Sequence, residues 1–431
     1  MSRLLIKEAV QQQGTITVAG FVRSLRGHKG LMFVDLADLS GQLQLVFTAD
    51  SPAFVIAEQL TLESVIEASG QLQSKPPKKG STEQEYEVLV QEAKIISLAD
   101  ASLPIPVLAK ADNEADTDNR FNWRWLDLRQ PNHQLIFKTW TELEKGFRQY
   151  WDQAGYLQIY TPTFMSTASE TGSEVFAVKY FDRQAYLAQS PQFYKQMAMA
   201  SGLEKVFAVG AVYRAEKSYT NRHNTEFTGW DFELSYINSE VEVMQELEKM
   251  LVAGFTQVKA KLNLDIVVPA LPFPRITLAE AKSKLATAKI KSETPDDFSA
   301  EEEQALGQII QQETGHDFVF ITAYPVSSRP FYHMQREDDP NLTKSFDLMY
   351  KGIEITTGAQ REHRYDVLKK QAEAKGMNTA ELEDYLNFFK YGCPAHGGAG
   401  IGPARIIMKL LGLNHLREAV FLPRDVRRLR P

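Results

Sequence analysis

The amino-acid sequence predicts an α+β protein, in which a small N-terminal β-barrel domain precedes a larger domain of mixed strands and helices. Across residues 15–98, apolar and polar residues alternate along several short runs, as in half-buried strands. From residue 132 onward, such runs mix with segments whose apolar residues recur every three or four positions, as in amphipathic helices. The 431 residues, 43% of them hydrophobic, are enough for two or three packed domains.

The first domain has the element order of a known small barrel. Three alternating runs lie within residues 15–48, and two more cover residues 64–72 and 85–98. Between the two groups, Ser51 is placed as the N-cap of a short helix with Pro52 at its first position. Three strands, a helix and two strands predict an OB-fold barrel, and some other small β-barrel is the alternative.

The rest of the chain is divided by its composition. We assign residues 1–103 to the barrel and residues 104–131, which contain stiffening prolines and an acidic stretch, to a hinge or connector. Residues 132–431 form the second domain, which opens with a predicted helix to about Ala154. Residues 280–316 are polar and helical in pattern, which predicts a peripheral insertion.

The charge and the cysteine content exclude several classes of protein and of binding site. The formal net charge is −7, so any nucleic acid must be met by local basic patches on an acidic body. The single cysteine allows no disulfide within the chain and no cysteine-based zinc site. No apolar run reaches the roughly 18 residues that a membrane span needs, and no signal-like run opens the chain. We therefore expect a cytoplasmic protein without membrane contact.

A hairpin with a charged tip is the first chemical signal. The apolar run 206–212 predicts a buried strand that leads into Arg214, and a second strand follows Phe227. The tip suits a polyphosphate, because Arg214 can bind an α-phosphate through two parallel hydrogen bonds. Arg222 and His223 can reach the outer phosphates, and Phe227 can lie against adenine. The alternative is a solvated loop with surface ion pairs.

A glycine-rich segment, Gly397–Arg405, is the second signal. Glycines let the backbone approach a ligand closely, and an apolar helical stretch follows them. The segment is not a Walker loop, because no Gly-Lys-Ser/Thr follows, and it does not fit a dinucleotide fingerprint. It therefore indicates a different ATP-binding geometry.

Together these segments resemble the class II aminoacyl-tRNA synthetases. Pro162 with its preceding residues, the hairpin Tyr213–Glu216, and Gly400–Arg405 resemble motifs 1, 2 and 3 of that class, in the same order. The resemblance covers nearly the whole chain. It implies a catalytic domain built on an antiparallel sheet flanked by helices, an OB-fold domain that binds the anticodon, and a homodimer formed through motif 1.

Two further segments resemble the aspartyl enzymes, namely Gln189–Gln196 and Gly352–Arg361. The short 280–316 insertion resembles the archaeal and eukaryotic type of that enzyme. The resemblance implies ATP-dependent activation of L-aspartate, with release of pyrophosphate, and transfer to the 3′ end of tRNA-Asp.

The resemblance also implies roles for individual residues. The implied aspartate-binding residues are Glu170, Ser190, Gln192, Lys195, Arg214, Asp231, Thr357 and Arg361. The implied ATP-binding residues are Arg214, Glu216, Arg222, His223, Phe227, Glu354, Gly402 and Arg405. Glu354 and Thr357 match ligands of Mg²⁺, the expected cofactor, although family members commonly have serine at the position of Thr357. Two cations facing one carboxylate, Lys195 and Arg361, suit aspartate. For each residue, an ordinary ion pair is the alternative.

Four residues of the barrel are implied to read the anticodon. Phe33 can stack on a base and Gln44 can hydrogen-bond a base edge, although Phe33 could equally belong to the barrel core. His28 and Pro77 lie in loops that flank the same face. Proline cannot read a base edge, because it has neither a side-chain donor nor an N–H group. We therefore expect tRNA-Asn to be accepted as well as tRNA-Asp, with an Asp-tRNA amidotransferase as a possible partner.

Four alternatives stay open from the sequence. A discriminating aspartyl enzyme would accept tRNA-Asp alone. An asparaginyl enzyme shares all three motifs but has no need of the cation at Lys195. A tRNA-independent amide ligase would not need the barrel, and an RNA-binding protein without enzymatic activity would not need Arg214, Glu354 and Arg405.

Overall fold

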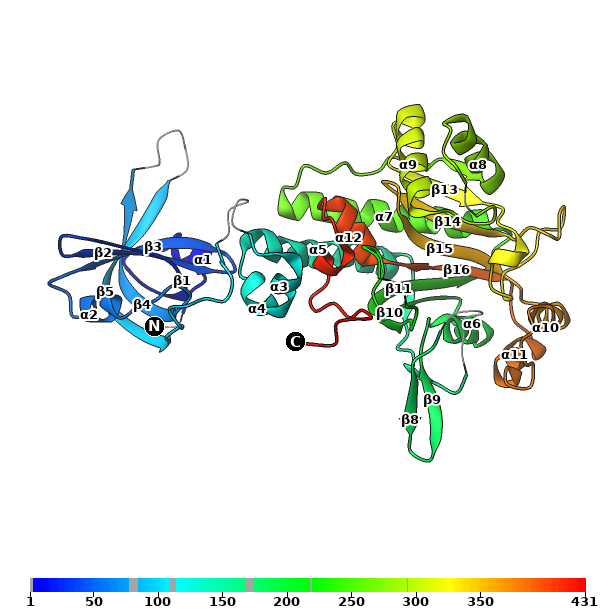
Figure 1. The fold of residues 1–431 in the computed structure, drawn as a ribbon, viewed down its shortest axis with the longest axis horizontal. Coiled ribbons are helices and arrows are strands. Elements are labelled where there is room, and N and C mark those ends of the chain that lie inside the picture. The colour runs from blue at the N-terminus through cyan, green and yellow to red at the C-terminus, as the bar shows by residue number, and fades with distance from the viewer. Residues whose placement is uncertain (1–2, 77–83, 109–113, 168–173, 218, 293) are drawn as a thin grey trace. The chain divides into compact units, whose positions relative to one another are not determined.

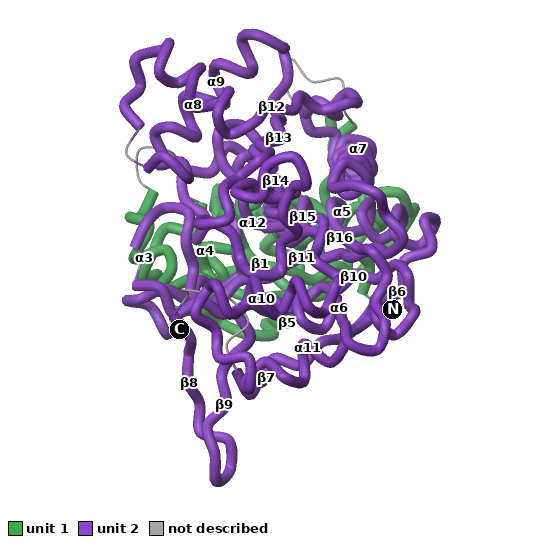
Figure 2. The backbone as a smooth tube through the Cα atoms, turned by 90° about the vertical axis from the view of Figure 1, so that its right-hand side faces the viewer, with its two compact units in different colours: residues 1–134 green, residues 135–431 purple. Residues whose placement is uncertain are grey.

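The computed structural model describes residues 3–76, 84–108, 114–167, 174–217, 219–292 and 294–431. The chain divides into two compact units, residues 1–134 and residues 135–431, which Figure 2 colours separately. Glu170 and Pro77, both predicted site residues, lie outside the described residues. Among the residues that are described, no helix is long and apolar enough to cross a membrane.

The N-terminal unit contains a closed five-stranded barrel in the order β1-β2-β3-β5-β4 (Figure 1). Its strands are β1 (Thr15–His28), β2 (Leu31–Asp38), β3 (Gly41–Thr48), β4 (Val65–Lys75) and β5 (Glu85–Ser97), with helix α1 (Ile6–Ala9) beside them. Every second side chain points inward, and these residues form the core, among them Val18, Val34, Leu36, Leu45, Phe47, Ile66 and Val88. The predicted OB-type barrel is confirmed.

The helix between β3 and β4 begins later than predicted. It is α2 (Phe54–Glu58), and its N-cap position is Ala53. The predicted N-cap position, Ser51, was therefore wrong by two residues. The Ser51 hydroxyl still accepts a hydrogen bond from the backbone N–H of Ala53 at 3.3 Å, and it donates one to the carbonyl oxygen of Val90 at 3.2 Å, which ties the turn to β5.

The predicted connector contains two short helices, α3 (Thr117–Asn122) and α4 (Arg124–Asp127), and it clusters with the barrel unit. Asp127 is fully buried and pairs with Arg120 at 2.9 Å and Arg124 at 2.5 Å. Burial alone would raise the pKa of Asp127, but His133 and Arg120 outweigh it and lower the pKa to about 2. This polar cluster and a small apolar cluster around Ile105, Val107 and Leu126 together hold the segment in place.

The second unit is built on an eight-stranded sheet in the order β12-β13-β14-β15-β16-β11-β10-β6. The strands are β6 (Leu157–Gln158), β10 (Lys205–Tyr213), β11 (Glu226–Ser235), β12 (Arg275–Thr277), β13 (Phe318–Thr322), β14 (Ser345–Tyr350), β15 (Glu354–Arg361) and β16 (His396–Ile401). All neighbouring pairs from β13 to β10 are antiparallel, and the two outermost pairs are parallel. A separate small sheet joins β7 (Phe164–Met165), β9 (Arg183–Leu187) and β8 (Ala177–Tyr180).

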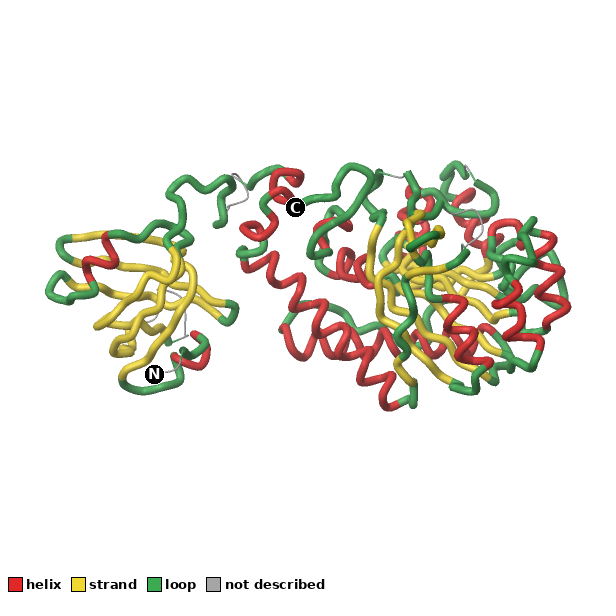
Figure 3. The backbone as a smooth tube through the Cα atoms, turned by 90° about the horizontal axis from the view of Figure 1, so that it is seen from below, coloured by secondary structure: helices red, strands yellow, loops and turns green. Residues whose placement is uncertain are grey.

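Helices flank this sheet, as Figure 3 shows. They are α5 (Pro131–Gln153), α6 (Gln192–Ala200), α7 (Glu240–Leu262), α8 (Leu278–Thr287), α9 (Ala300–Thr314), α10 (Tyr365–Ala374), α11 (Glu383–Lys390) and α12 (Pro403–Leu410). Aromatic residues of α5 and α7 pack with those of β11 and β13 in the main core, for example Phe147, Trp151, Trp230, Phe232, Phe255 and Phe318. The predicted antiparallel sheet flanked by helices is confirmed.

Residues 280–316, predicted as a peripheral insertion, form most of α8 and all of α9. Their apolar faces share a core with β13 and β14, which includes Leu285, Leu306, Ile310, Val319, Ile321 and Met349. Burying each such side chain is worth about 1.5–3 kcal/mol, so the two helices are firmly attached to the sheet.

Candidate functional site

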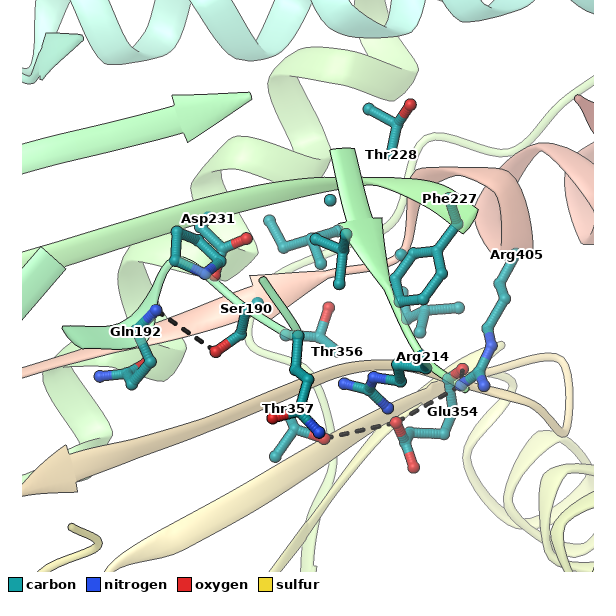
Figure 4. Close-up of a pocket in the computed structure, with 18 of the residues that line it drawn as sticks. Ser190, Gln192, Arg214, Phe227, Thr228, Asp231, Glu354, Thr356, Thr357 and Arg405 are labelled. Carbon is teal, nitrogen blue, oxygen red and sulfur yellow. Dashed lines mark hydrogen bonds and ion pairs between the residues drawn. The ribbon is translucent and has the colours of Figure 1, made fainter. Parts of the chain in front are cut away.

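A cavity of about 320 Å³ opens over the middle of the large sheet. Strands β11, β15 and β16 and the loop between β10 and β11 supply more than half of its lining, together with the start of α6 and the segment 329–333 (Figure 4). Most predicted site residues line it, namely Ser190, Gln192, Arg214, Glu216, Arg222, His223, Phe227, Asp231, Glu354, Thr357, Arg361, Gly402 and Arg405. The structure thus brings together residues that lie far apart in the sequence.

The strand register explains this convergence. Asp231 of β11 lies opposite Gly400 of β16, and Gly400 lies opposite Thr357 of β15. Thr357 in turn lies opposite Asp347 of β14, so one row crosses four strands. A Cβ atom at Gly400 would come within 3.2 Å of the Asp231 carboxylate. The glycine-rich strand therefore leaves room for the side chains of its neighbours.

Four charged side chains form a cluster beneath one end of the cavity. Lys195 is fully buried, and its Nζ lies 2.8 Å from Asp231 Oδ1 and 3.3 Å from Glu233 Oε2. Arg361 Nε lies 3.0 Å from Glu233 Oε1. Burial would raise the pKa of Glu233, but Arg361 and Lys195 outweigh it and lower that pKa. Two cations and two carboxylates therefore balance each other in the absence of a ligand.

His333 completes this cluster and was missed in the sequence. Its Nε2 lies 2.8 Å from Arg361 Nη1, which can only donate, so the imidazole accepts at Nε2 and carries its hydrogen on Nδ1. Nδ1 has no hydrogen-bond partner within the part of the chain that the structure describes. Burial and then the charge of Arg361 lower the pKa of His333 well below its usual value, so the ring is neutral.

The other end of the cavity is strongly basic. The guanidinium of Arg214 lies over the ring of Phe227, 5.6 Å from its centroid. Burial, followed by the charges of Arg405, Arg222 and Arg214, lowers the pKa of His223 to about 4. Three arginines that converge on one neutral imidazole create the field that an oligophosphate needs.

Carboxylates meet beside these arginines. Glu354 accepts hydrogen bonds from Thr357 Oγ1 at 3.3 Å and from Arg405 Nη1 at 3.4 Å. Burial and then the charge of Asp347 raise the pKa of Glu354 to about 7. Asp347, also missed in the sequence, is held by Arg329 at 3.0 and 2.5 Å.

A divalent cation would fit beside these two carboxylates. It would relieve the repulsion between Glu354 and Asp347, and Mg²⁺ is usually held by one or two carboxylates plus substrate phosphates. No group of three or more described histidine, cysteine, aspartate or glutamate residues is arranged to hold a metal by itself. We therefore expect Mg²⁺ to bind here together with the phosphates of a nucleotide.

Three of the four predicted anticodon residues, His28, Phe33 and Gln44, lie on described strands of the barrel. Phe33 is half-buried and alternates with the inward-facing Val34, so it is not part of the barrel core. Gln44 lines a second cavity, of about 620 Å³, and accepts a hydrogen bond from Lys75 Nζ at 2.7 Å. His28 is exposed at the end of β1. These positions leave Phe33, Gln44 and His28 available to a ligand on the outer face.

Comparisons with known proteins agree with both units. Residues 116–426 match the family model described as tRNA synthetases class II (D, K and N), and residues 16–96 match the one described as OB-fold nucleic acid binding domain. An aspartate–tRNA(Asp/Asn) ligase of Methanopyrus kandleri is 40% identical over 426 residues, which cover 96% of each chain. An aspartate–tRNA(Asp) ligase of Pyrococcus abyssi is 38% identical over 428 residues, also 96% of each chain.

Solved structures of two kinds share the fold. The aspartyl-tRNA synthetase of Entamoeba histolytica has a TM-score of 0.88 at 30% identity, over 100% of this chain and 93% of that one. The asparaginyl-tRNA synthetase of Pyrococcus horikoshii, complexed with asparaginyl-adenylate, has a TM-score of 0.91 at 28% identity, over 100% of both chains. Because aspartyl- and asparaginyl-tRNA synthetases share this fold, the choice between aspartate and asparagine must depend on side chains in the cavity.

Proposed function

Because the chain belongs to the class II tRNA synthetases of the D, K and N group, we propose that it is an aspartate–tRNA ligase. It activates L-aspartate with ATP and transfers the aspartyl group to the 3′ end of tRNA-Asp. The observation that carries the proposal is the buried pair of cations, Lys195 and Arg361, at the end of the cavity away from the three arginines; Arg361 lines the cavity and Lys195 lies buried beneath it. An amide substrate would bring no carboxylate to pair with these cations when its α-ammonium displaces Lys195 from Asp231.

Aspartate suits the charged cluster because it is a zwitterion with a second carboxylate. Its α-ammonium can take the place of Lys195 beside Asp231, and its side-chain carboxylate can then pair with Lys195 and Arg361. Every buried charge keeps a partner in this exchange, as a low-dielectric site requires. Asparagine brings no such carboxylate, and a site built to pair a polar group rejects the unpaired analogue by roughly 10⁴-fold. Ser190, Gln192 and Glu170 complete the proposed aspartate site.

The basic end of the cavity binds ATP in this proposal. Aspartate attacks the α-phosphorus in line through its α-carboxylate, the bond to the bridging oxygen breaks, and pyrophosphate leaves. Arg214 stabilises the charge that develops on the α-phosphate, while Arg222, His223 and Arg405 hold the rest of the nucleotide. The terminal ribose hydroxyl of tRNA then attacks the aspartyl carbonyl carbon, and AMP leaves.

Some side chains of this end have narrower roles. Glu354 and Thr357 would hold Mg²⁺, which neutralises charge on the phosphates when it is bound. Phe227 lies against adenine, and Glu216 and Gly402 complete the lining of the nucleotide site. No side chain is assigned as a general acid or base.

The proposal is tested by exchange of pyrophosphate into ATP, which measures the first step alone. We expect exchange with aspartate and none with asparagine. Exchange with asparagine only would make the protein an asparaginyl enzyme, and formation of an amide and AMP without tRNA would make it a ligase of small molecules. Absence of Mg²⁺-dependent ATP binding by calorimetry would leave only the RNA-binding alternative.

We extend the proposal to tRNA-Asn. The two tRNAs differ at the third anticodon base, so discrimination belongs to the barrel, where Phe33 can stack on a base and Gln44 can pair with an edge. Pro77 offers no group to read that edge. A protein of this kind would supply Asp-tRNA-Asn to an amidotransferase. Some relatives are named aspartate–tRNA(Asp/Asn) ligase and others aspartate–tRNA(Asp) ligase, and both groups match this chain at similar identity. A separate experiment is therefore needed to establish which tRNAs the protein accepts.

Aspartylation of purified tRNA-Asp and tRNA-Asn transcripts, side by side, is expected to give kcat/KM values within about tenfold of each other. A contact that reads a base edge supplies about 1–3 kcal/mol of discrimination, and none is expected at the third base. Alanine at Phe33 should weaken both reactions, because stacking is worth about 1–3 kcal/mol whatever the third base is. A preference for tRNA-Asp of several hundredfold would show a discriminating enzyme and leave the amino-acid assignment intact.

A homodimer also belongs to the proposal. Large apolar side chains are exposed around the motif 1 segment and the β8–β9 hairpin, with Tyr160 at 84% and Phe181 at 80% exposure. Exposed apolar groups that lie close together often mark a subunit interface. A cytoplasmic location, where tRNAs are charged, completes the proposal.

A further inference from the structure

Helix α9 reaches the basic end of the cavity through one carboxylate. Glu303 Oε1 lies 2.7 Å from Arg222 Nη1, and Glu303 Oε2 accepts a hydrogen bond of 3.2 Å from the backbone N–H of Glu354. The side chain of Glu303 is only 6% exposed. A single buried group therefore joins α9, the β10–β11 loop and the first residue of β15.

The backbone of α9 is fixed at this place. A Cβ atom at Gly307 would lie 2.6 Å from the backbone nitrogen of Gly352, which no real contact allows. Gly352 has a φ of +70°, and a Cβ atom there would lie 2.8 Å from Gln304 Cα. At its N-terminus the helix is capped by Ser299, which forms a reciprocal capping box with Glu302. The helix is thus so close to the turn before β15 that any shift of α9 would also move that turn.

The negative charge of Glu303 is balanced by the guanidinium of Arg222. Burial raises the pKa of Glu303, and the charge and hydrogen bond of Arg222 act against that rise. The pair is therefore mutually dependent, because each partner would be a buried or half-buried charge without the other. Arg222 is the residue of the loop that the proposed function assigns to the outer phosphates of ATP.

We propose that Glu303 is a positioning residue of the nucleotide site, which fixes the guanidinium of Arg222 and the backbone at Glu354 before ATP binds. The α8–α9 pair is then a functional part of the catalytic unit. This inference rests on the proposed function for the identity of the nucleotide. A fixed arginine binds phosphate better than a mobile one, because less side-chain entropy is lost on binding.

Glu303→Gln in the full chain tests the inference, and Glu302→Gln is its matched control. Glu302 is the adjacent residue of α9, is fully buried and pairs with Lys282 at 2.7 Å, and none of its contacts reaches Arg222 or Glu354. We expect Glu303→Gln to raise the KM for ATP in pyrophosphate exchange about tenfold and to leave the KM for aspartate within about twofold. Glu302→Gln should change neither KM, even if both variants lower the Tm.

Two further measurements make the outcome decisive. Calorimetric binding of Mg²⁺–ATP without amino acid should weaken in Glu303→Gln alone, and this readout does not depend on which amino acid is activated. In the double variant with Arg222→Met, the effect of Glu303→Gln should vanish, because the two residues act as a unit. Equal ATP binding in both glutamine variants, or tighter binding in Glu303→Gln, would overturn the inference. Loss of aspartate-dependent exchange in the wild type would overturn the proposed function instead.

Discussion

Lys195→Met is expected to lower kcat/KM for aspartate activation by about 10³-fold or more. Methionine keeps the length of the side chain but removes the charge that lies 2.8 Å from Asp231 and 3.3 Å from Glu233. The substrate carboxylate would then meet one cation, Arg361, beside two carboxylates. Because the ATP site lies at the other end of the cavity, the KM for ATP should stay within about threefold of the wild type. Pyrophosphate exchange at varied aspartate and ATP concentrations measures both effects.

Arg275→Met is the matched control for this variant. Arg275 also pairs with a buried carboxylate, Glu248, at 3.2 Å, and neither residue lines the cavity. Both variants strip a partner from a buried acid, so both should lower the Tm, but the control should keep its aspartate kinetics. Activation within tenfold of the wild type in Lys195→Met would remove Lys195 from the aspartate site.

Glu354→Gln is expected to lower the maximal rate of pyrophosphate exchange by about 10²–10³-fold. Glutamine is close in shape, but it removes the half-buried carboxylate that Thr357 and Arg405 contact at 3.3 and 3.4 Å. The Mg²⁺ concentration at half-maximal rate should also rise, because the metal loses an ionised ligand. Rates measured across a Mg²⁺ titration at saturating ATP and aspartate separate the two effects.

Glu248→Gln offers the corresponding control, since Glu248 is buried and accepts hydrogen bonds from Phe273 and Arg275 outside the cavity. Its rate and Mg²⁺ dependence should match the wild type. An unchanged Mg²⁺ dependence in Glu354→Gln would show that the metal is held elsewhere, even if the rate falls.

The sequence predicted the features that local patterns encode. Period-two alternation marks the barrel strands, because each strand buries one face. The segments around Arg214, Lys195, Arg361 and Arg405 were found because they are contiguous motifs. The family match over residues 116–426 supports the interpretation of these segments together.

Residues that depend on strand register could not be predicted. Asp347 comes near Glu354 because it lies opposite Thr357, and nothing in the sequence near Asp347 indicates this pairing. Glu233 and His333 join the charged cluster through tertiary contacts with Arg361. Glu303 stands in a polar helix whose pattern suggests only a solvated face. A pair such as Asp231 and Glu233, two residues apart in a strand, is the one local signal that could have pointed to Glu233.

Strand β16 has glycines, Gly398 and Gly400, where it passes the cavity, and this restricts how the site can change in evolution. At Gly398 any side chain would meet the backbone oxygen of Phe232 at 2.1 Å, whereas a Cβ atom at Gly400 would crowd only the Asp231 carboxylate at 3.2 Å. The middle strand of the cavity is therefore a constant part of the scaffold, although it presents no side chain to the ligand there. New amino-acid preferences then have to arise from side chains of neighbouring elements, such as Lys195 of α6, Asp231 of β11 and Arg361 of β15. A lineage that exchanged those residues could alter its substrate without altering its fold.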